Sequence, residues 1–75
     1  MKRRPYPIRE QTIDGEKLRA ARLKAGMTQE DLARAVDTYG STVCRWENGH
    51  CSPPLVFLRR LARQFGVPLE DLLLE

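Results

Sequence analysis

The sequence predicts an all-α fold, a compact bundle of five short helices preceded by an extended basic arm. Apolar residues are mostly Leu, Val and Ala at helical spacing, and aromatic residues make up only 7% of the chain. Glycines and prolines divide the apolar stretches into short units with recognisable start and stop signals. A chain of 75 residues forms one domain with a modest core, so we expect no large substrate cavity.

A first helix is predicted for residues 15–25. Asp14 can cap its amino end through its carboxylate, and Gly26 can end the helix in a left-handed conformation. One face of this helix carries the small and apolar side chains expected to pack into the core, Leu18, Ala21 and Ala25.

A second and a third helix are predicted for residues 29–36 and 40–48, joined by a tight turn. Thr28 and Asp31 form a capping-box variant at the start of the second helix. The connecting residues 37–40 supply turn chemistry, because Asp and Gly both tolerate positive φ. The side chains expected to face inward from these two helices are Leu32, Ala33, Val36, Val43 and Trp46.

Two further helices are predicted at the carboxyl end. Ser52 can cap a fourth helix that opens with Pro53 and Pro54 in its first turn, and Gly66 ends it. Pro68 then starts a short fifth helix. The expected buried residues of these two helices are Leu55, Leu58, Leu61, Ala62, Phe65, Leu69 and Leu72.

The amino-terminal residues 1–13 are predicted to be a flexible basic arm, with the ordered domain in residues 14–75. The arm contains Pro5 and Pro7 and shows no helical period. The chain has a net charge of +3, and its positive residues lie in the arm and the middle while its end is acidic. This distribution suits a protein that approaches a polyanion with one side, although charge alone does not establish nucleic-acid binding.

No cofactor, metal or membrane partner is expected. No stretch approaches the roughly 20 apolar residues of a membrane span, and no signal-peptide-length apolar run follows the basic start, so we expect a cytoplasmic protein. Cys44, His50 and Cys51 offer three zinc-ligand types with no fourth nearby, and a redox role for the thiols stays open. One histidine without a convergent nucleophile or carboxylate predicts that the chain is not an enzyme.

The segment TQEDLARAVDTYGSTVCRWENG, residues 28–49, places two short helices around a tight turn. KAGMTQEDLA precedes and overlaps it, Pro53 follows after a short loop, and LRRLARQFGVPLEDLL completes the pattern. In these segments and their order, residues 15–73 resemble the Xre-type helix-turn-helix family, which includes the Cro and repressor proteins of lambdoid phages. The resemblance implies a phage-repressor-type fold and a sequence-specific DNA-binding transcriptional regulator, most simply a repressor.

The resemblance also implies which residues meet double-stranded DNA. Gln29 matches a glutamine that bonds a phosphate, and Gly40, Ser41 and Arg45 match positions that read base edges in the major groove. Arg45 is the main candidate for specificity, because a guanidinium can bond guanine O6 and N7 together. Thr42 lies beside these positions. Positions typical of phosphate contacts are Thr38, Tyr39 and Asn48.

Two further implications concern the framework. Arg22 and Glu47 match a partly buried ion pair between the first helix and the end of the third. The chain departs from the family pattern in the turn, where Asp37 replaces a usual Gly and Tyr39 replaces a usual capping Ser or Thr. We therefore expect Thr38 to cap the third helix in place of Tyr39.

Val56 and Phe57 lie on flanks of the fourth helix that are usually polar in the family, and with Leu73 and Leu74 they predict an exposed apolar surface. We interpret it as a homodimer surface, or as a surface for an unknown protein partner. The main alternative is an extension of the core by arm residues, namely Tyr6, Ile8 and Ile13. An alternative function is a protein-interaction module, antitoxin-like or an assembly factor, with little or no DNA binding.

Overall fold

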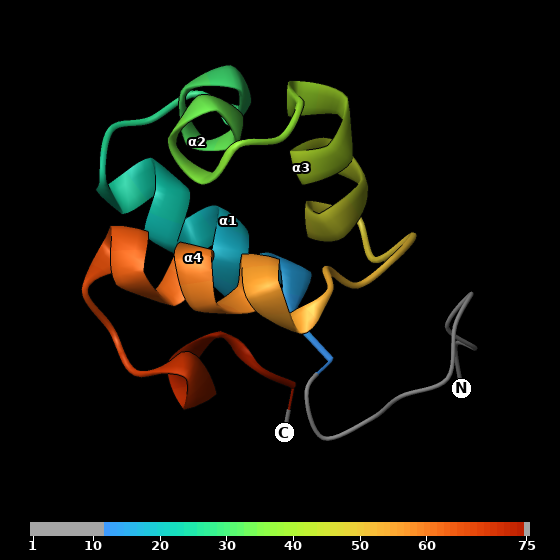
Figure 1. The fold of residues 1–75 in the computed structure, drawn as a ribbon, viewed down its shortest axis with the longest axis vertical. Helices are drawn as coiled ribbons and strands as arrows, with labels where there is room; N and C mark the ends of the chain where they lie inside the picture. Colours follow the sequence, from blue (N-terminus) through green and yellow to red (C-terminus); the bar gives the residue numbers. More distant parts are fainter. Residues whose placement is uncertain (1–11, 75) are drawn as a thin grey trace.

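The computed structural model describes residues 12–74 and contains four α-helices and one 3-10 turn within them (Figure 1). The sequence correctly predicts the all-α fold, but the expected fifth helix is this single 3-10 turn. The first and third helices each end one residue earlier than predicted. In chain order the elements are α1 (Gly15–Lys24), α2 (Gln29–Val36), α3 (Gly40–Glu47), α4 (Leu55–Phe65) and η1 (Leu69–Leu72).

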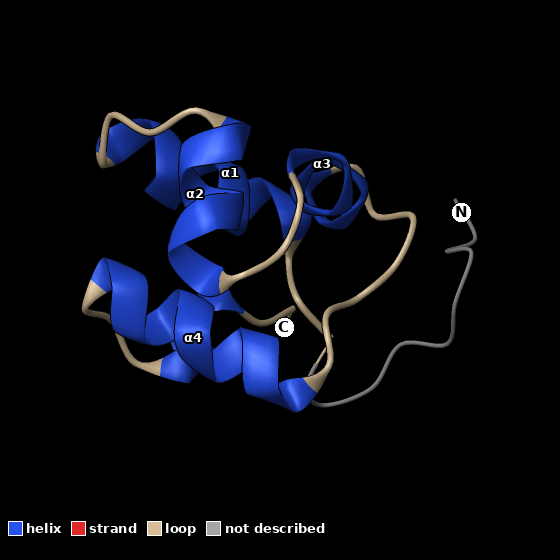
Figure 2. Ribbon diagram, turned by 45° about the horizontal axis from the view of Figure 1, so that its top comes forward, coloured by secondary structure: helices blue, strands red, loops and turns tan. Residues whose placement is uncertain are grey.

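The helices form two groups around a shared core. Figure 1 shows α2 and α3 above α1 and α4, with η1 below α4, and Figure 2 shows that only loops connect the helices. The α2–α3 pair makes the most extensive helix contact, while α1 supports α3 and α4 supports α2. No helix within residues 12–74 is long and apolar enough to cross a membrane.

The caps of α1 and α2 follow the predicted local chemistry. The Asp14 carboxylate accepts hydrogen bonds from the first-turn amides of α1, and Gly26 follows that helix with a positive φ of 71°. At α2, the Thr28 hydroxyl accepts from the Asp31 amide, and the Asp31 carboxylate accepts from the Thr28 amide, both at 3.0 Å. The hydrogen bond from the Thr28 amide, followed by one from the Thr28 side chain, stabilises the ionised carboxylate and lowers the pKa of Asp31 below its usual value.

The turn between α2 and α3 confirms one expectation and corrects another. Asp37 adopts the left-handed conformation with a φ of 68°, as its turn chemistry predicts. Thr38 does not lie at the cap position of α3, because α3 begins at Gly40, and its backbone N–H donates to the Ala33 carbonyl at 2.8 Å at the end of α2. Tyr39 is the residue at the cap position, and its side chain makes no capping hydrogen bond.

The core lies where the four helices meet. The sequence predicts Ala25 and Leu55 to be buried, but both are exposed, because α1 ends before Ala25 and Leu55 is the first residue of α4. Ala21, Phe65 and Leu69 are only partly buried against the core. The buried apolar residues are Ile13, Leu18, Leu32, Ala33, Val36, Val43, Trp46, Leu58, Leu61, Ala62 and Leu72.

The ordered domain begins before the predicted boundary. Thr12 and Ile13, assigned to the arm by the sequence, have buried side chains. Ile13 forms an isolated antiparallel bridge with Leu73, and the Leu74 amide donates to the Thr12 carbonyl at 2.9 Å. Residues 1–11, with the other predictions for the arm, lie outside the described residues.

The predicted cap of α4 is wrong, because α4 begins at Leu55 and Ser52 lies three residues before it. The Ser52 hydroxyl accepts a hydrogen bond from the Ile13 amide at 3.2 Å. The hydroxyl therefore ties the loop before α4 to the amino-terminal segment. Pro54 lies at the cap position of α4 and makes no side-chain capping bond.

Candidate nucleic-acid interface

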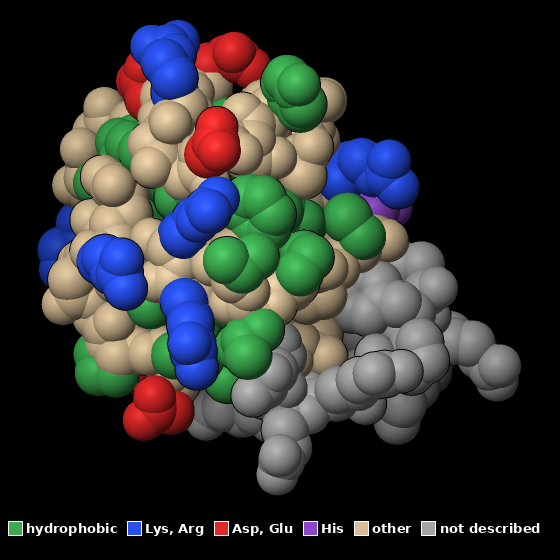
Figure 3. Space-filling model, viewed as in Figure 1, with side chains coloured by type: hydrophobic (Ala, Val, Ile, Leu, Met, Phe, Trp, Pro, Cys, Tyr) green, Lys and Arg blue, Asp and Glu red, His purple; other side chains and the backbone are tan. Residues whose placement is uncertain are grey.

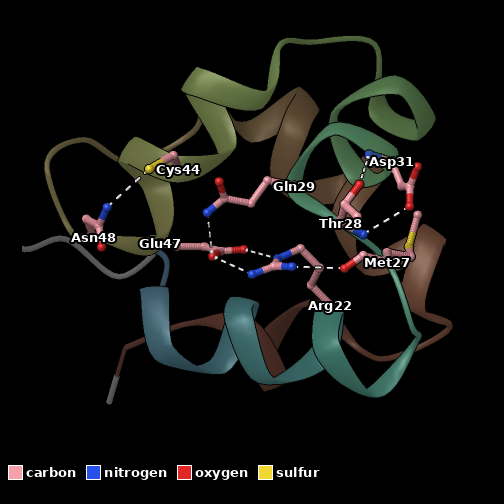
Figure 4. Close-up of polar contacts among 8 residues, drawn as sticks. All are labelled: Arg22, Met27, Thr28, Gln29, Asp31, Cys44, Glu47 and Asn48. Atoms are coloured by element: carbon pink, nitrogen blue, oxygen red, sulfur yellow. Dashed lines mark hydrogen bonds and ion pairs between the residues drawn. The ribbon is translucent and has the colours of Figure 1, made fainter.

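A buried ion pair joins α1 to the carboxyl end of α3 (Figure 4). Arg22 Nε donates to Glu47 Oε2 at 2.6 Å, and Arg22 Nη2 donates to Glu47 Oε1 at 3.2 Å. The side chains are only 9% and 3% exposed, respectively. Arg22 Nη1 also donates to the Met27 carbonyl at 2.9 Å, so three N–H groups of the guanidinium donate to protein acceptors. The hydrogen bond to Glu47 is the main cause of the raised pKa of Arg22.

Gln29 extends this pair to α2. Its Nε2 atom donates to Glu47 Oε1 at 3.1 Å, and the side chain is half-buried. The Glu47 carboxylate therefore binds the amino end of α2 as well as α1 (Figure 4). Because a side-chain amide nitrogen carries two hydrogens, the second N–H of Gln29 stays available for another acceptor.

Gly15 allows α1 to approach the end of α3 closely. A Cβ atom at this position would collide with the backbone carbonyls of Trp46 and Glu47. Any larger residue would push the amino end of α1 away from α3, where the ion pair forms. The sequence gives no local signal for this requirement, because the contact joins segments far apart in the chain.

The outer face of α3 is polar and exposed. Ser41, Arg45 and Asn48 are exposed, and helical spacing places them on the side opposite the buried Val43 and Trp46. Thr38, Thr42 and Cys44 are half-buried, and the Tyr39 side chain is 77% exposed. The exposed members of the predicted contact set are therefore Tyr39, Ser41, Arg45 and Asn48. Gln29, Thr38 and Thr42 are partly buried, and Gly40 is buried.

Gly40 differs in burial from the other predicted base-reading positions. It is buried at the first position of α3, and a Cβ there would collide with the carboxylate of Glu30. The glycine makes room for the flexible end of a side chain of α2, and its role in base contact stays a prediction. The Glu30 side chain comes from the first turn of α2 and lies beside the amino end of α3, and the sequence pattern does not single it out.

The predicted apolar surface is smaller than expected. The Phe57 ring packs against Trp46 with centroids 5.6 Å apart, so it belongs largely to the domain interior. Leu73 and Leu74 are half-buried because their backbones pair with residues 12–13. Val56, with half of its side chain exposed at 50%, is the predicted residue that stays open.

The cysteines and the histidine do not converge. Cys44 and Cys51 are half-buried free thiols, and His50 is exposed. Asn48 Nδ2 donates to the Cys44 sulfur at 3.3 Å, which holds that thiol on the flank of α3. Among residues 12–74, no group of three or more His, Cys, Asp or Glu side chains could hold a metal ion.

Comparison with known proteins gives one family. A family model described as a helix-turn-helix domain matches residues 15–74. A transcriptional regulatory protein of the HTH type from Pyrobaculum aerophilum is 42% identical over 55 residues, which cover 73% of this chain but 22% of that protein. An uncharacterized HTH-type transcriptional regulator of Archaeoglobus fulgidus is 39% identical over 56 residues, covering 75% of this chain and 80% of the relative.

Solved structures share the same arrangement. The P22 c2 repressor, solved in complex with a synthetic operator, superposes with a TM-score of 0.76 at 27% identity, covering 79% of this chain and 89% of that one. Hydroxypropylphosphonic acid epoxidase from S. wedmorenis contains a similar unit, with a TM-score of 0.74 and 28% identity. That match covers 88% of this chain but 36% of the epoxidase.

Glu47→Gln tests the ion pair without changing the size of the side chain. The variant leaves the buried Arg22 charge without a charged partner, so we expect the free energy of unfolding to fall by about 3 kcal/mol. Urea denaturation followed by circular dichroism measures this change. Glu70→Gln, at an exposed carboxylate of η1, is the matched control and should change stability little. A Glu47→Gln protein as stable as the control would contradict the role of the pair.

Proposed function

We propose that this chain, which belongs to the helix-turn-helix domain family, is a sequence-specific DNA-binding transcriptional regulator that places α3 in the major groove. The observation that carries the proposal is the open polar face of α3 on a helix held rigidly at its carboxyl end. Ser41, Arg45 and Asn48 share this face, while Glu47 on the opposite side is bound by α1 and α2. The face of α3 that would read DNA is thus separate from the contacts that fix the orientation of α3.

Arg45 is the proposed base-reading residue. Its side chain is exposed on α3, and a guanidinium can donate to guanine O6 and N7 in one plane. Ser41 is short, and Gly40 is covered, so Arg45 carries most of the direct readout. The remaining specificity would come from DNA shape.

Phosphate contacts would fix the register of α3 on the duplex. Gln29 can keep one N–H on Glu47 and offer the second to a phosphate oxygen. Thr38 and Tyr39 precede α3 and lie where phosphates flank the groove, with Asn48 at the other end of the helix. The name of the Archaeoglobus relative and the operator complex of the P22 c2 repressor support this function, and the second also supports a repressor role.

We further propose that two copies bind a roughly palindromic site as a homodimer, with half-site centres about one helical turn apart. Hydrophobic side chains gather between α3 and α4 on the face seen in Figure 3. Leu55 and Val56, at the amino end of α4, are 40% and 50% exposed. Burying them in a second copy would remove apolar surface from water, so these two residues replace Phe57 at the centre of the proposed dimer surface.

A protein-interaction module is the second candidate function. The match to a part of an epoxidase favours it, because a similar unit occurs there within a longer enzyme chain. The small reading surface of α3 is consistent with that role. In either case we propose that the domain itself is not catalytic, since its single histidine, His50, is exposed, and no group of three or more His, Cys, Asp or Glu side chains among residues 12–74 could hold a metal ion.

Arg45→Ala distinguishes these functions. Loss of a bidentate contact to guanine should lower the affinity for a preferred duplex about tenfold or more and relax the preference at one base pair. Fluorescence anisotropy with matched duplexes that differ at single base pairs measures both effects. Arg63→Ala removes the same charge from an exposed position on α4 and is the control. Equal affinity and equal base preference in wild type and Arg45→Ala would refute base reading by Arg45.

Val56→Glu tests the dimer. A charge on this half-exposed side chain leaves the monomer core intact and opposes burial against a second copy, so the sedimentation coefficient should shift toward the monomer. Leu23→Glu, at a 57% exposed position of α1, is the matched control and should sediment like the wild type. Identical sedimentation of Val56→Glu and wild type would exclude this surface.

A further inference from the structure

We propose that Arg60 is a positioning residue, which fixes the carboxyl end of α2 and the end of α3 relative to α4. The proposal rests on the proposed function, because its consequence for DNA binding requires α3 to be the reading helix. Arg60 lies on α4, and its side chain contacts Val36 and Phe57, neither of which is a predicted DNA-contact residue. Its effect would pass through the helices that carry them.

The first contact is with the last residue of α2. Arg60 Nη1 donates to the Val36 carbonyl at 3.1 Å. This carbonyl is one of the terminal acceptors that an α-helix cannot satisfy internally. A cation there also interacts favourably with the partial negative charge at the carboxyl end of the helix. Asp37 follows at once in the left-handed conformation, so the bond holds the residue from which the chain turns toward α3.

The second contact leads to α3 through two rings. The Arg60 guanidinium lies over the Phe57 ring, 5.2 Å from its centroid. Phe57 in turn packs on Trp46, with the ring planes tilted by 51°. Trp46 is buried at 2% exposure near the end of α3. One guanidinium thus braces both helices of the helix-turn-helix from the same position on α4.

The surface between α2 and α4 is hollowed at this point. A hollow of about 330 Å³ lies beside Arg60 and is lined by side chains of the α2 end and α4. Its lining residues are Ala35, Val36, Asp37, Arg60, Arg63 and Gln64. The Arg60 bond to the Val36 carbonyl therefore joins two of the residues that line this hollow.

Arg63 provides a matched control for charge. It lies three residues after Arg60 on α4, just under one helical turn away, lines the same hollow and is likewise exposed. Three arginines lie on α4, namely Arg59, Arg60 and Arg63, and Figure 3 shows positively charged side chains over this helix. Removing either Arg60 or Arg63 therefore changes the electrostatic attraction to DNA similarly. A difference between Arg60→Ala and Arg63→Ala therefore reports contacts and not net charge.

The first measurements test, in the protein without DNA, whether Arg60 holds the turn after α2 and the end of α3 in place. Arg60→Ala should speed amide hydrogen exchange of Thr38, whose N–H bonds the end of α2, about fivefold or more relative to Leu18 in α1. Trp46 is the single tryptophan, so its fluorescence should change as the Phe57 contact loosens. Arg63→Ala should change neither. Arg60→Lys, which keeps the charge and a donor, should restore Thr38 protection in part.

DNA binding is measured second, as the ratio of affinities for a preferred and a random duplex. Arg60→Ala should lower this ratio about fivefold, while Arg63→Ala should leave it unchanged. Equal Thr38 exchange in the two alanine variants would overturn the proposal, as would an Arg60→Ala effect spread evenly over Thr38 and Leu18.

If the wild type prefers no duplex, the proposed function fails, and the exchange and fluorescence results alone decide whether Arg60 holds the turn. If Arg60→Ala does not fold, the same comparison between Arg60→Lys and Arg63→Ala decides.

Discussion

The buried Glu47 carboxylate is the interaction on which the arrangement of this domain depends. It accepts two hydrogen bonds from Arg22 in α1 and one from Gln29 in α2. A carboxylate removed from water is costly unless such donors replace its hydration, so these helices must keep their places around it. Gly15 adds a steric condition, because only a residue without Cβ lets α1 reach the end of α3.

This constraint matters because α3 has little stability of its own. It is 8 residues long, and Tyr39 gives it no side-chain cap. Its orientation therefore comes from neighbours: the Glu47 network at its carboxyl end, the buried Trp46, and the turn held at Asp37. Because all of these contacts lie on the inner side, the outer face with Arg45 is free to meet a partner.

Sequence reasoning succeeded where structure follows from local chemistry. The Thr28–Asp31 capping box and the left-handed Gly26 depend on residues within one turn, so their patterns predict them. The Arg22–Glu47 pair came from family resemblance, since no local pattern links residues so far apart. The expected Thr38 cap was wrong, because α3 begins at Gly40 and Tyr39 lies at the cap position.

Contacts between distant segments account for the other differences. Because Ile13 forms a bridge with Leu73, the ordered domain begins earlier than predicted, and part of the expected apolar surface is covered. Phe57 was placed at the surface by its helix register, yet Trp46 offers it a ring to pack against. Gly40 matched a contact position, and the side chain that covers it comes from the neighbouring helix. Such pairings depend on how helices cross, which periodicity within one helix does not specify.

The central claim is that the outer face of α3 reads a DNA sequence. Selection of binding sites by the full chain from a pool of random duplexes tests it most directly. We expect the pool to be enriched in a half-site that contains a guanine bound by Arg45. Two copies of this half-site should be related by two-fold symmetry, with their centres about one helical turn apart. A pool that stays random after repeated selection at physiological salt would contradict it.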